Sequence, residues 1–211
     1  MKLLYSNILP LGIEDTQQTI IDCFTEQLSR ADRVEIAVGY ISTASVNELA
    51  NMVEKYGIKN ICLTIGMYYI EGMPEGAYHT ALKLNQKWRD MGIGEIRLVK
   101  PFKYHGKVYC FYKHEKPFAA IIGSANLGAI KLEAANRRQY EISALTTNTT
   151  EISDIAEHIE QSAAQAADLF RRRIRHHRPA QRANAFTEEG QRHKADDHPL
   201  HVNVVTEHHH H

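Results

Sequence analysis

A group of polar residues in the middle of the chain has the types and spacing of a phosphate site. His105 and Lys107 stand two residues apart in a strand-like run, so their side chains point to the same face. There the lysine can neutralise an anion while the imidazole approaches its central atom. Ser124 and Asn126 can supply hydroxyl and amide donors from the end of a neighbouring strand, and Gly123 lets the backbone approach a ligand closely. This combination predicts a phosphate site that contains a nucleophile.

Each half of this pattern is weak when it is taken alone. A lone histidine in a strand is usually packed or solvent-facing, and Gly, Ser and Asn are common turn formers. The two halves together, on successive strands and in this order, are much more specific.

The paired pattern resembles the signature half-motif of the phospholipase D superfamily, in which H-x-K is followed by G-S-x-N and then by a glutamate in the next strand. The resemblance implies that His105 is the nucleophile and that Lys107 binds the phosphate. It also implies that Ser124 and Asn126 contact the phosphate and that Glu141 orients the histidine. The order of the predicted strands fits the α/β/α sandwich of that superfamily.

One position departs from the superfamily pattern, because Tyr112 stands where an aspartate is expected, five residues after Lys107. That aspartate is mostly structural in the family, and nuclease branches lack it. A single motif without the aspartate resembles the NgoFVII-type restriction endonucleases. These are similar to small bacterial phospholipase D-like nucleases, but carry a separate DNA-reading domain after the catalytic one. The resemblance covers roughly residues 30–175.

The resemblance implies a metal-independent endonuclease that hydrolyses DNA through a covalent phosphohistidine. This displacement needs two histidines, one to attack phosphorus and one to protonate the leaving oxygen. Because the chain has one copy of the motif, two chains would each supply a His105 across the two-fold axis of a homodimer. No cofactor is implied, and no cluster of carboxylate metal ligands accompanies the motif. Two alternatives stay open: a phospholipid-processing phosphodiesterase, and a non-catalytic DNA-binding or assembly domain.

Hydrophobic periodicity predicts the elements that position these residues. Helical spacing marks four segments: 14–31, 43–56, 77–91 and 151–174. Strand-like runs mark six others: 34–38, 61–65, 96–99, 107–112, 118–122 and 140–145. The alternation in the first half predicts an α/β fold with a mixed, mostly parallel sheet and helices on both faces. The short turn after residue 112 suits a hairpin, and a small helix is expected from Leu127.

An arginine-rich segment is a further candidate for contact with DNA. It begins with Arg171, Arg172 and Arg173 and has six arginines and no acidic residue in the twelve positions 171–182. Cations near a helix C-terminus are stabilised by the macrodipole, so the segment is either a solvated helix end or a contact with the DNA backbone.

Two other sets of residues lie where DNA could be bound. Tyr40 and Tyr68 follow two successive strands at their carboxyl ends, where α/β sheets bind ligands, although ordinary βα loops explain each residue alone. Lys103 and Tyr104 flank the histidine and could steer a phosphate towards it.

Composition limits the class of protein. The 211 residues include 25 Lys+Arg and 25 Asp+Glu, and 43% are hydrophobic, which is ordinary for a globular protein. A net charge of zero argues against a nucleic-acid partner unless the charge is unevenly distributed. Three cysteines, Cys23, Cys62 and Cys110, are read as buried thiols in the cytoplasm. The sequence predicts no signal peptide and no membrane-spanning segment.

The pattern divides the chain into three parts. Residues 1–178 are the predicted phospholipase D-like catalytic domain. Residues 179–207 are polar and read either as a loosely ordered tail or as a linker towards a DNA-recognition domain. Residues 208–211 are four histidines, typical of a purification tag.

Overall fold

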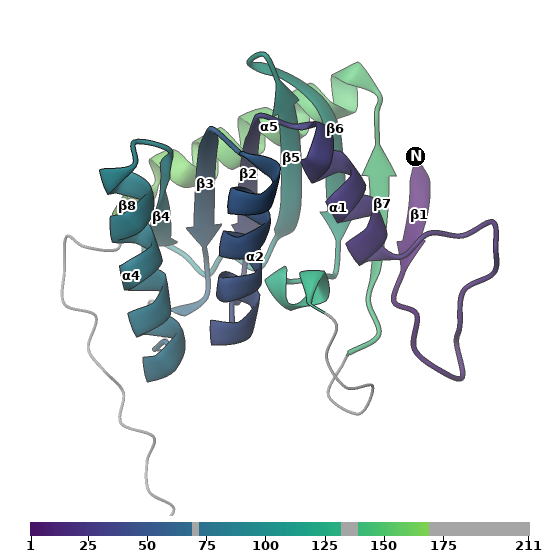
Figure 1. Cartoon of the computed structure of the whole chain (residues 1–211), viewed down its shortest axis with the longest axis horizontal. Helices are drawn as coiled ribbons and strands as arrows, with labels where there is room; N and C mark the ends of the chain where they lie inside the picture. The colour runs from purple at the N-terminus through teal and green to yellow at the C-terminus, as the bar shows by residue number, and fades with distance from the viewer. Residues whose placement is uncertain (69–71, 132–138, 169–211) are drawn as a thin grey trace, which may run out of the picture. The chain divides into compact units, whose positions relative to one another are not determined.

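The computed structural model describes residues 1–68, 72–131 and 139–168, which form a mixed sheet between two layers of helices (Figure 1). Within these residues the sheet has eight strands in the order β1-β7-β6-β5-β2-β3-β4-β8. The strands are β1 (Lys2–Tyr5), β2 (Arg33–Val38), β3 (Asn60–Ile65), β4 (Gly94–Val99), β5 (Lys107–Lys113), β6 (Lys116–Gly123), β7 (Ile142–Thr146) and β8 (Ala166–Asp168). The helices are α1 (Ile20–Arg30), α2 (Thr43–Tyr56), α4 (Glu75–Asp90), α5 (Thr149–Ala164) and the short 3-10 helix η1 (Leu127–Ile130).

Helices cover both faces of the sheet, as the sequence predicted. Helices α1, α2 and α4 lie on one face and α5 on the other (Figure 1). Side chains of β5 alternate between the two layers: Tyr109 and Phe111 belong to the cluster under the first set of helices, and Val108 and Cys110 pack with Ile159 of α5. The α/β/α sandwich is therefore confirmed. Along the described part of the chain, no helix is long and apolar enough to cross a bilayer.

The sheet has fewer parallel pairs than we predicted. Only β2–β3 and β3–β4 are parallel in the described residues, and the other neighbours are antiparallel. The expectation of a mostly parallel sheet is therefore wrong. The β5–β6 hairpin, whose turn residues His114 and Glu115 have positive φ angles of 50° and 62°, accounts for one antiparallel pair, because so tight a turn joins only antiparallel strands. The other four antiparallel pairs join strands that no short turn connects, so local spacing does not indicate their direction.

The helix boundaries differ most from the sequence-based expectations at the start of α1 and at the end of α5. Helix α1 begins at Ile20, where Thr19 caps it by accepting a hydrogen bond from the backbone N–H of Asp22, and the predicted helix began at residue 14. Helix α5 ends at Ala164, and Ala166–Asp168 then pair with the edge of β4. The remainder of the predicted helix 151–174, the tail 179–207 and the histidines 208–211 lie outside the described residues.

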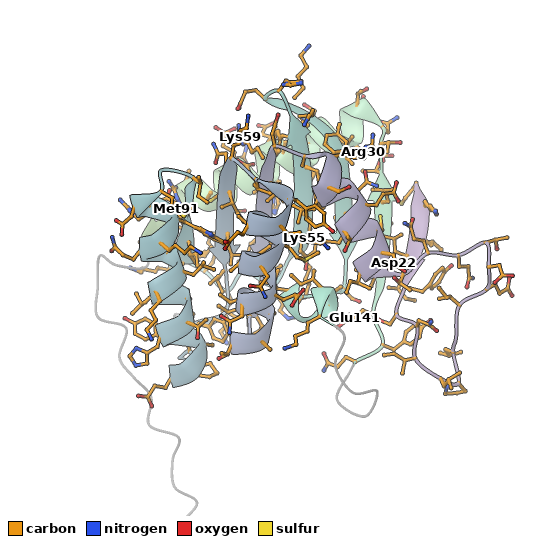
Figure 2. The ribbon with its side chains drawn as sticks, viewed as in Figure 1. Asp22, Arg30, Lys55, Lys59, Met91 and Glu141 are labelled. Carbon is orange, nitrogen blue, oxygen red and sulfur yellow. The ribbon has the colours of Figure 1, made fainter. Side chains whose placement is uncertain are left out.

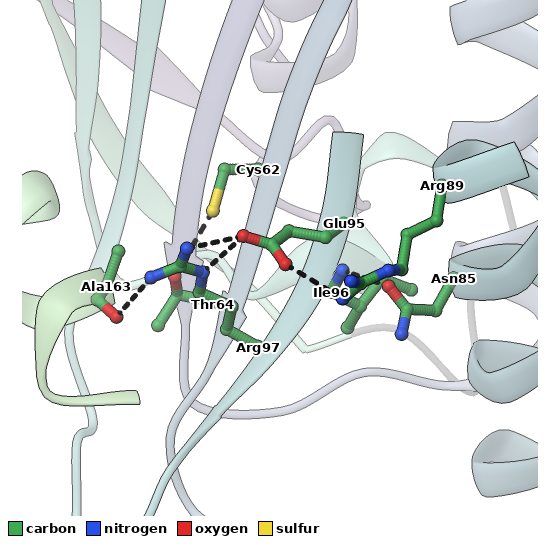
Figure 3. A network of polar contacts seen from close by, with 8 residues as sticks. All are labelled: Cys62, Thr64, Asn85, Arg89, Glu95, Ile96, Arg97 and Ala163. Carbon is green, nitrogen blue, oxygen red and sulfur yellow. Dashed lines mark hydrogen bonds and ion pairs between the residues drawn. The ribbon is translucent and has the colours of Figure 1, made fainter. Parts of the chain in front are cut away.

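Helix α5 is fixed to the sheet at its C-terminal end by a polar network (Figure 3). In β4, Arg97 donates through Nη1 to the carbonyl oxygen of Ala163 at 2.9 Å and through Nε to Glu95 at 2.7 Å. At the opposite side of the same strand, the side chain of Asn85 accepts a hydrogen bond from the backbone N–H of Ile96 at 2.6 Å. Both helix layers are therefore tied to β4 independently of the candidate site.

Candidate active site

The five residues of the predicted motif converge at one end of the sheet. Strands β2, β3 and β6 end there, while β5 and β7 begin there, as the register shows: Val38 pairs with Lys107, and Gly123 pairs with Ser143. His105 lies in the segment just before β5, and Glu141 lies just before β7. Segments that are far apart in the chain therefore meet around one surface.

His105 lies against the end of β2. Its ring is edge-on to the ring of Tyr40, with centroids 5.8 Å apart and planes at 80°. Gly39 is also in contact with it, since a Cβ atom added to that glycine would lie 2.9 Å from Cδ2 of the imidazole. The residue is exposed, so the imidazole can be reached by a substrate.

Lys107 is buried beside the histidine. Its Nζ donates a hydrogen bond to the carbonyl oxygen of His105 at 2.6 Å. Burial lowers the pKa of Lys107 below its ordinary value, and the nearby carboxylate of Glu141 opposes this shift. The ammonium group is thus a largely desolvated positive charge, which is effective in stabilising an anion.

Ser124 joins β6 to Glu141. Its hydroxyl donates a short hydrogen bond to the carboxylate of Glu141 and accepts one from the backbone N–H of Ile142 at 3.1 Å. Glu141 is labelled in Figure 2, and its backbone N–H donates to the Ser6 hydroxyl at 3.0 Å. In this structure the carboxylate is therefore paired with Ser124, whereas the resemblance implied a contact with His105.

Asn126 connects the ends of β6 and β2. Its Oδ1 accepts a hydrogen bond from the backbone N–H of Tyr40 at 3.1 Å. The adjacent carbonyl oxygen of Ala125 accepts one from the hydroxyl of Tyr109 at 2.7 Å. The segment that carries Ser124 and Asn126 is thus fixed on both sides, which preorganises its polar groups.

The four candidates for contact with DNA near the motif have different surroundings. Tyr40 is half-buried beside His105, and Lys103 is exposed. Tyr68 is buried, and its hydroxyl donates to the carbonyl oxygen of Ile41 at 2.6 Å, so it supports the loop after β2. Tyr104 is also buried, on the face that α5 covers. Arg171, Arg172 and Arg173 lie outside the described residues.

Three residues of the site were not identified from the sequence. Gly39 stands in the loop after β2, which the sequence placed at the carboxyl ends of the strands. Its contact with His105, however, depends on how β2 and β5 pair. Tyr109 follows Lys107 by two residues, so strand periodicity could have placed it on the same face. Ser6 carries no local signal, because β1 joins the sheet from the far end of the sequence.

The groups of the site suit the binding and reaction of an anion. Among residues 1–68, 72–131 and 139–168, no group of three or more His, Cys, Asp and Glu side chains is arranged to hold a metal ion. An exposed imidazole, a buried ammonium group, a hydroxyl and an amide surround the end of the sheet. This arrangement suits nucleophilic attack on a phosphate ester.

Two solved structures share the fold of this chain. NucT from Helicobacter pylori superposes with a TM-score of 0.52 at 17% identity, over 79% of this chain and 99% of that one. Nuc from Salmonella typhimurium, a phospholipase D family member, superposes with a TM-score of 0.52 at 16% identity, over 79% of this chain and 95% of that one. No curated protein matches the chain significantly. The fold is therefore that of the phospholipase D superfamily.

The family follows from the sequence match. Residues 18–171 match the model described as the NgoFVII restriction endonuclease N-terminal PLD domain. The chain belongs to this family, and it is a hydrolase, a nuclease of the phospholipase D type.

Proposed function

We propose that this protein hydrolyses DNA phosphodiester bonds as the catalytic domain of a restriction-type endonuclease. The observation that carries the proposal is the convergence of His105, Lys107, Ser124, Asn126 and Glu141 at one end of the sheet. The exposed arrangement of this surface suits a long polymer better than a small ligand, and the family includes a restriction endonuclease.

The proposed reaction has two steps and no metal ion. The imidazole of His105 attacks phosphorus, a P–N bond forms, and the bond to the leaving oxygen breaks as a second histidine donates its proton to that oxygen. The second histidine then removes a proton from water, which attacks phosphorus and releases His105. We assign the second histidine to the His105 of a second copy of the chain, in a two-fold symmetric dimer.

The other motif residues stabilise the charge. Lys107 neutralises the oxygens of the phosphoryl group, and Ser124 and Asn126 donate hydrogen bonds to them. When a phosphate oxygen takes the hydrogen bond of the Ser124 hydroxyl, the carboxylate of Glu141 is free to accept one from the imidazole and to stabilise its charged form.

Binding of DNA is proposed to begin beside this site. Tyr40 offers an aromatic face next to the nucleophile, and Lys103 is an exposed residue two positions before it. Arg171, Arg172 and Arg173 add positive charge further along the chain and suit phosphate contacts. The proposal needs no net positive charge, because these contacts are local.

The test is cleavage of supercoiled plasmid DNA in EDTA, beside a phosphatidylcholine hydrolysis assay. We expect DNA nicking in EDTA, its loss in His105→Ala, and a covalent protein–DNA adduct after denaturation in alkaline detergent. His114→Asn is the matched control, since this exposed histidine lies in the hairpin turn at the other end of β5 and asparagine tolerates a positive φ.

Three results would contradict parts of the proposal. Cleavage that stops in EDTA and returns with Mg²⁺ would exclude the metal-independent route. Full activity in a strictly monomeric protein would exclude the shared site. Hydrolysis of phosphatidylcholine without cleavage of DNA would favour a phospholipid-processing enzyme.

A further inference from the structure

Tyr104, the residue before the candidate nucleophile, is anchored to α5 on the opposite face of the sheet. Its side chain is buried, and its hydroxyl lies 3.2 Å from Nε2 of His158. The two rings are stacked, with centroids 5.8 Å apart and planes at 29°. Helix α5 therefore holds Tyr104 through a hydrogen bond and through ring stacking, both with His158.

The backbone around Tyr104 is fixed as closely as its side chain. Its N–H donates to the carbonyl oxygen of Gly66, at the end of β3, at 3.3 Å. A Cβ atom at Gly66 would overlap the carbonyl oxygen of Tyr104, and one at Gly106 would lie 2.5 Å from its hydroxyl oxygen. The segment that carries His105 thus lies against β3, while the Tyr104 ring lies over Gly106 and reaches α5.

His105 itself has little else to fix its position. Its carbonyl oxygen accepts the hydrogen bond from Lys107, and its ring touches Gly39 and Tyr40. Its ring makes no hydrogen bond to any residue in the described part of the chain. The backbone on either side must therefore determine where the imidazole lies, with Lys107 on one side and Tyr104 on the other.

We propose that Tyr104 is a positioning residue for His105, held in place by His158 of α5. This inference rests on the proposed function, and it replaces the sequence-based hypothesis that Tyr104 contacts DNA. Tyr104 packs in the cluster beneath α5, whereas the ring of His105 lies against Gly39 and Tyr40. The anchor of Tyr104 on α5 therefore fixes the backbone from which the imidazole extends. A loss of this anchor loosens the imidazole without removing any group that touches the substrate.

The helix does not need this contact for its own stability. Arg97 already binds the carbonyl oxygen of Ala163, and Ile152 and Ile159 are buried against the sheet. Removal of the Tyr104 hydroxyl should therefore leave the fold intact and act on the chemical step, because the rate depends steeply on how reacting atoms are placed.

The experiment compares kcat and KM for DNA cleavage in three variants of the full chain. Tyr104→Phe should lower kcat by about tenfold and leave KM within about twofold of the wild type. The expected loss is smaller than the roughly hundredfold loss of rate that a displacement of reacting atoms by about 1 Å can cause. His158→Ala should also lower kcat. The double variant should lose less activity than the product of the two single losses, because both changes remove the same Tyr104–His158 hydrogen bond.

The matched control is Tyr112→Phe. Tyr112 is another buried tyrosine at the far end of β5, where its hydroxyl donates to Glu35 at 2.8 Å. This variant loses one hydroxyl from the same sheet and face, but should keep the kcat of the wild type. An equal loss of kcat in Tyr112→Phe would overturn the inference, as would an unchanged kcat in Tyr104→Phe. A change confined to KM would restore the hypothesis of a DNA contact.

A measurement without turnover separates this inference from the proposed function. If the wild type cleaves no phosphodiester, the proposed function fails, and the imidazole NMR signals of His105 then decide the positioning role. We expect Tyr104→Phe to shift or broaden the His105 ring signals, and Tyr112→Phe to leave them unchanged. Identical His105 signals in the wild type and Tyr104→Phe would refute the inference.

Discussion

A methyl group at Gly39 tests whether the position of His105 controls activity. In Gly39→Ala, the new Cβ would lie 2.9 Å from Cδ2 of the imidazole, whereas ordinary contacts begin at 3.4 Å. The ring must therefore move by about 0.5 Å (3.4 minus 2.9), since the backbone of β2 is held in the middle of the sheet. The same Cβ would approach Met67 Cγ at 3.3 Å and Asn126 Oδ1 at 3.5 Å, and both contacts are close to ordinary.

The expected result is a loss of activity without a loss of stability. A misplacement of about 1 Å can cost about a hundredfold, so a shift of about half that size should lower kcat by about tenfold. Replacement of glycine by alanine outside the left-handed region stabilises a protein by about 0.4–1 kcal/mol through the unfolded state. This gain in stability offsets the destabilisation caused by the close contacts of the new methyl group, and we expect Tm to stay within about 4 °C of the wild type.

The assay is single-turnover cleavage of a labelled DNA duplex beside thermal unfolding, with two comparison variants. Gly128→Ala in η1 is the matched control, because a Cβ there meets no atom within 4 Å, and it should keep both activity and Tm. Gly66→Ala should lose about 1–3 kcal/mol of stability or more, because its Cβ overlaps the backbone carbonyl of Tyr104 rather than a side chain.

Cleavage by Gly39→Ala at the rate of the wild type would refute this prediction. Unfolding of Gly39→Ala as readily as Gly66→Ala would refute it equally, since the added methyl group would then disturb the fold and not the imidazole.

Two further predictions concern the neighbours of the nucleophile. Burial lowers the pKa of Lys107, so between its folded and unfolded pKa values the unfolded chain binds more protons and stability rises with pH. The Tm of the wild type relative to Lys107→Met should therefore increase as the pH rises towards the ordinary lysine pKa of 10.5, and a decrease would contradict this sign. Tyr109→Phe leaves the carbonyl of Ala125 without its hydrogen bond. The change should lower the free energy of unfolding by about 1–3 kcal/mol, which chemical denaturation measures, and it should lower kcat for DNA cleavage. An unchanged kcat would show that the Ser124–Asn126 segment is fixed by other contacts.

Local patterns predicted most of the elements because they depend on nearby residues. The bounds of α2 agree with the prediction, since Ser42 and Ser45 form a capping box and Gly57 ends the helix with a φ of 64°. The β5–β6 hairpin is also local. The predicted start of α1 was wrong because residues 14–19 are all polar and the capping residue is Thr19. The predicted end of α5 was wrong because Ala166–Asp168 pair with the edge of β4 instead of continuing the helix.

The sheet pairing was less predictable because it joins distant parts of the chain. No sequence pattern indicates that β1 pairs with β7, yet this pairing brings Ser6 to the backbone of Glu141. Likewise, β5 lies beside β2 rather than beside β4, and this order places His105 against Gly39.

The sequence by itself determined the candidate groups of the site and their order along the chain: an imidazole, an ammonium group, a hydroxyl, an amide and a carboxylate. Strand periodicity placed His105 and Lys107 on one face, and the family resemblance added the carboxylate. Only the tertiary structure decided what each group contacts. Glu141 is paired with Ser124, and Tyr104 is turned to α5 although it adjoins His105, because the register of the sheet and the packing of a helix distant in sequence fix both neighbours.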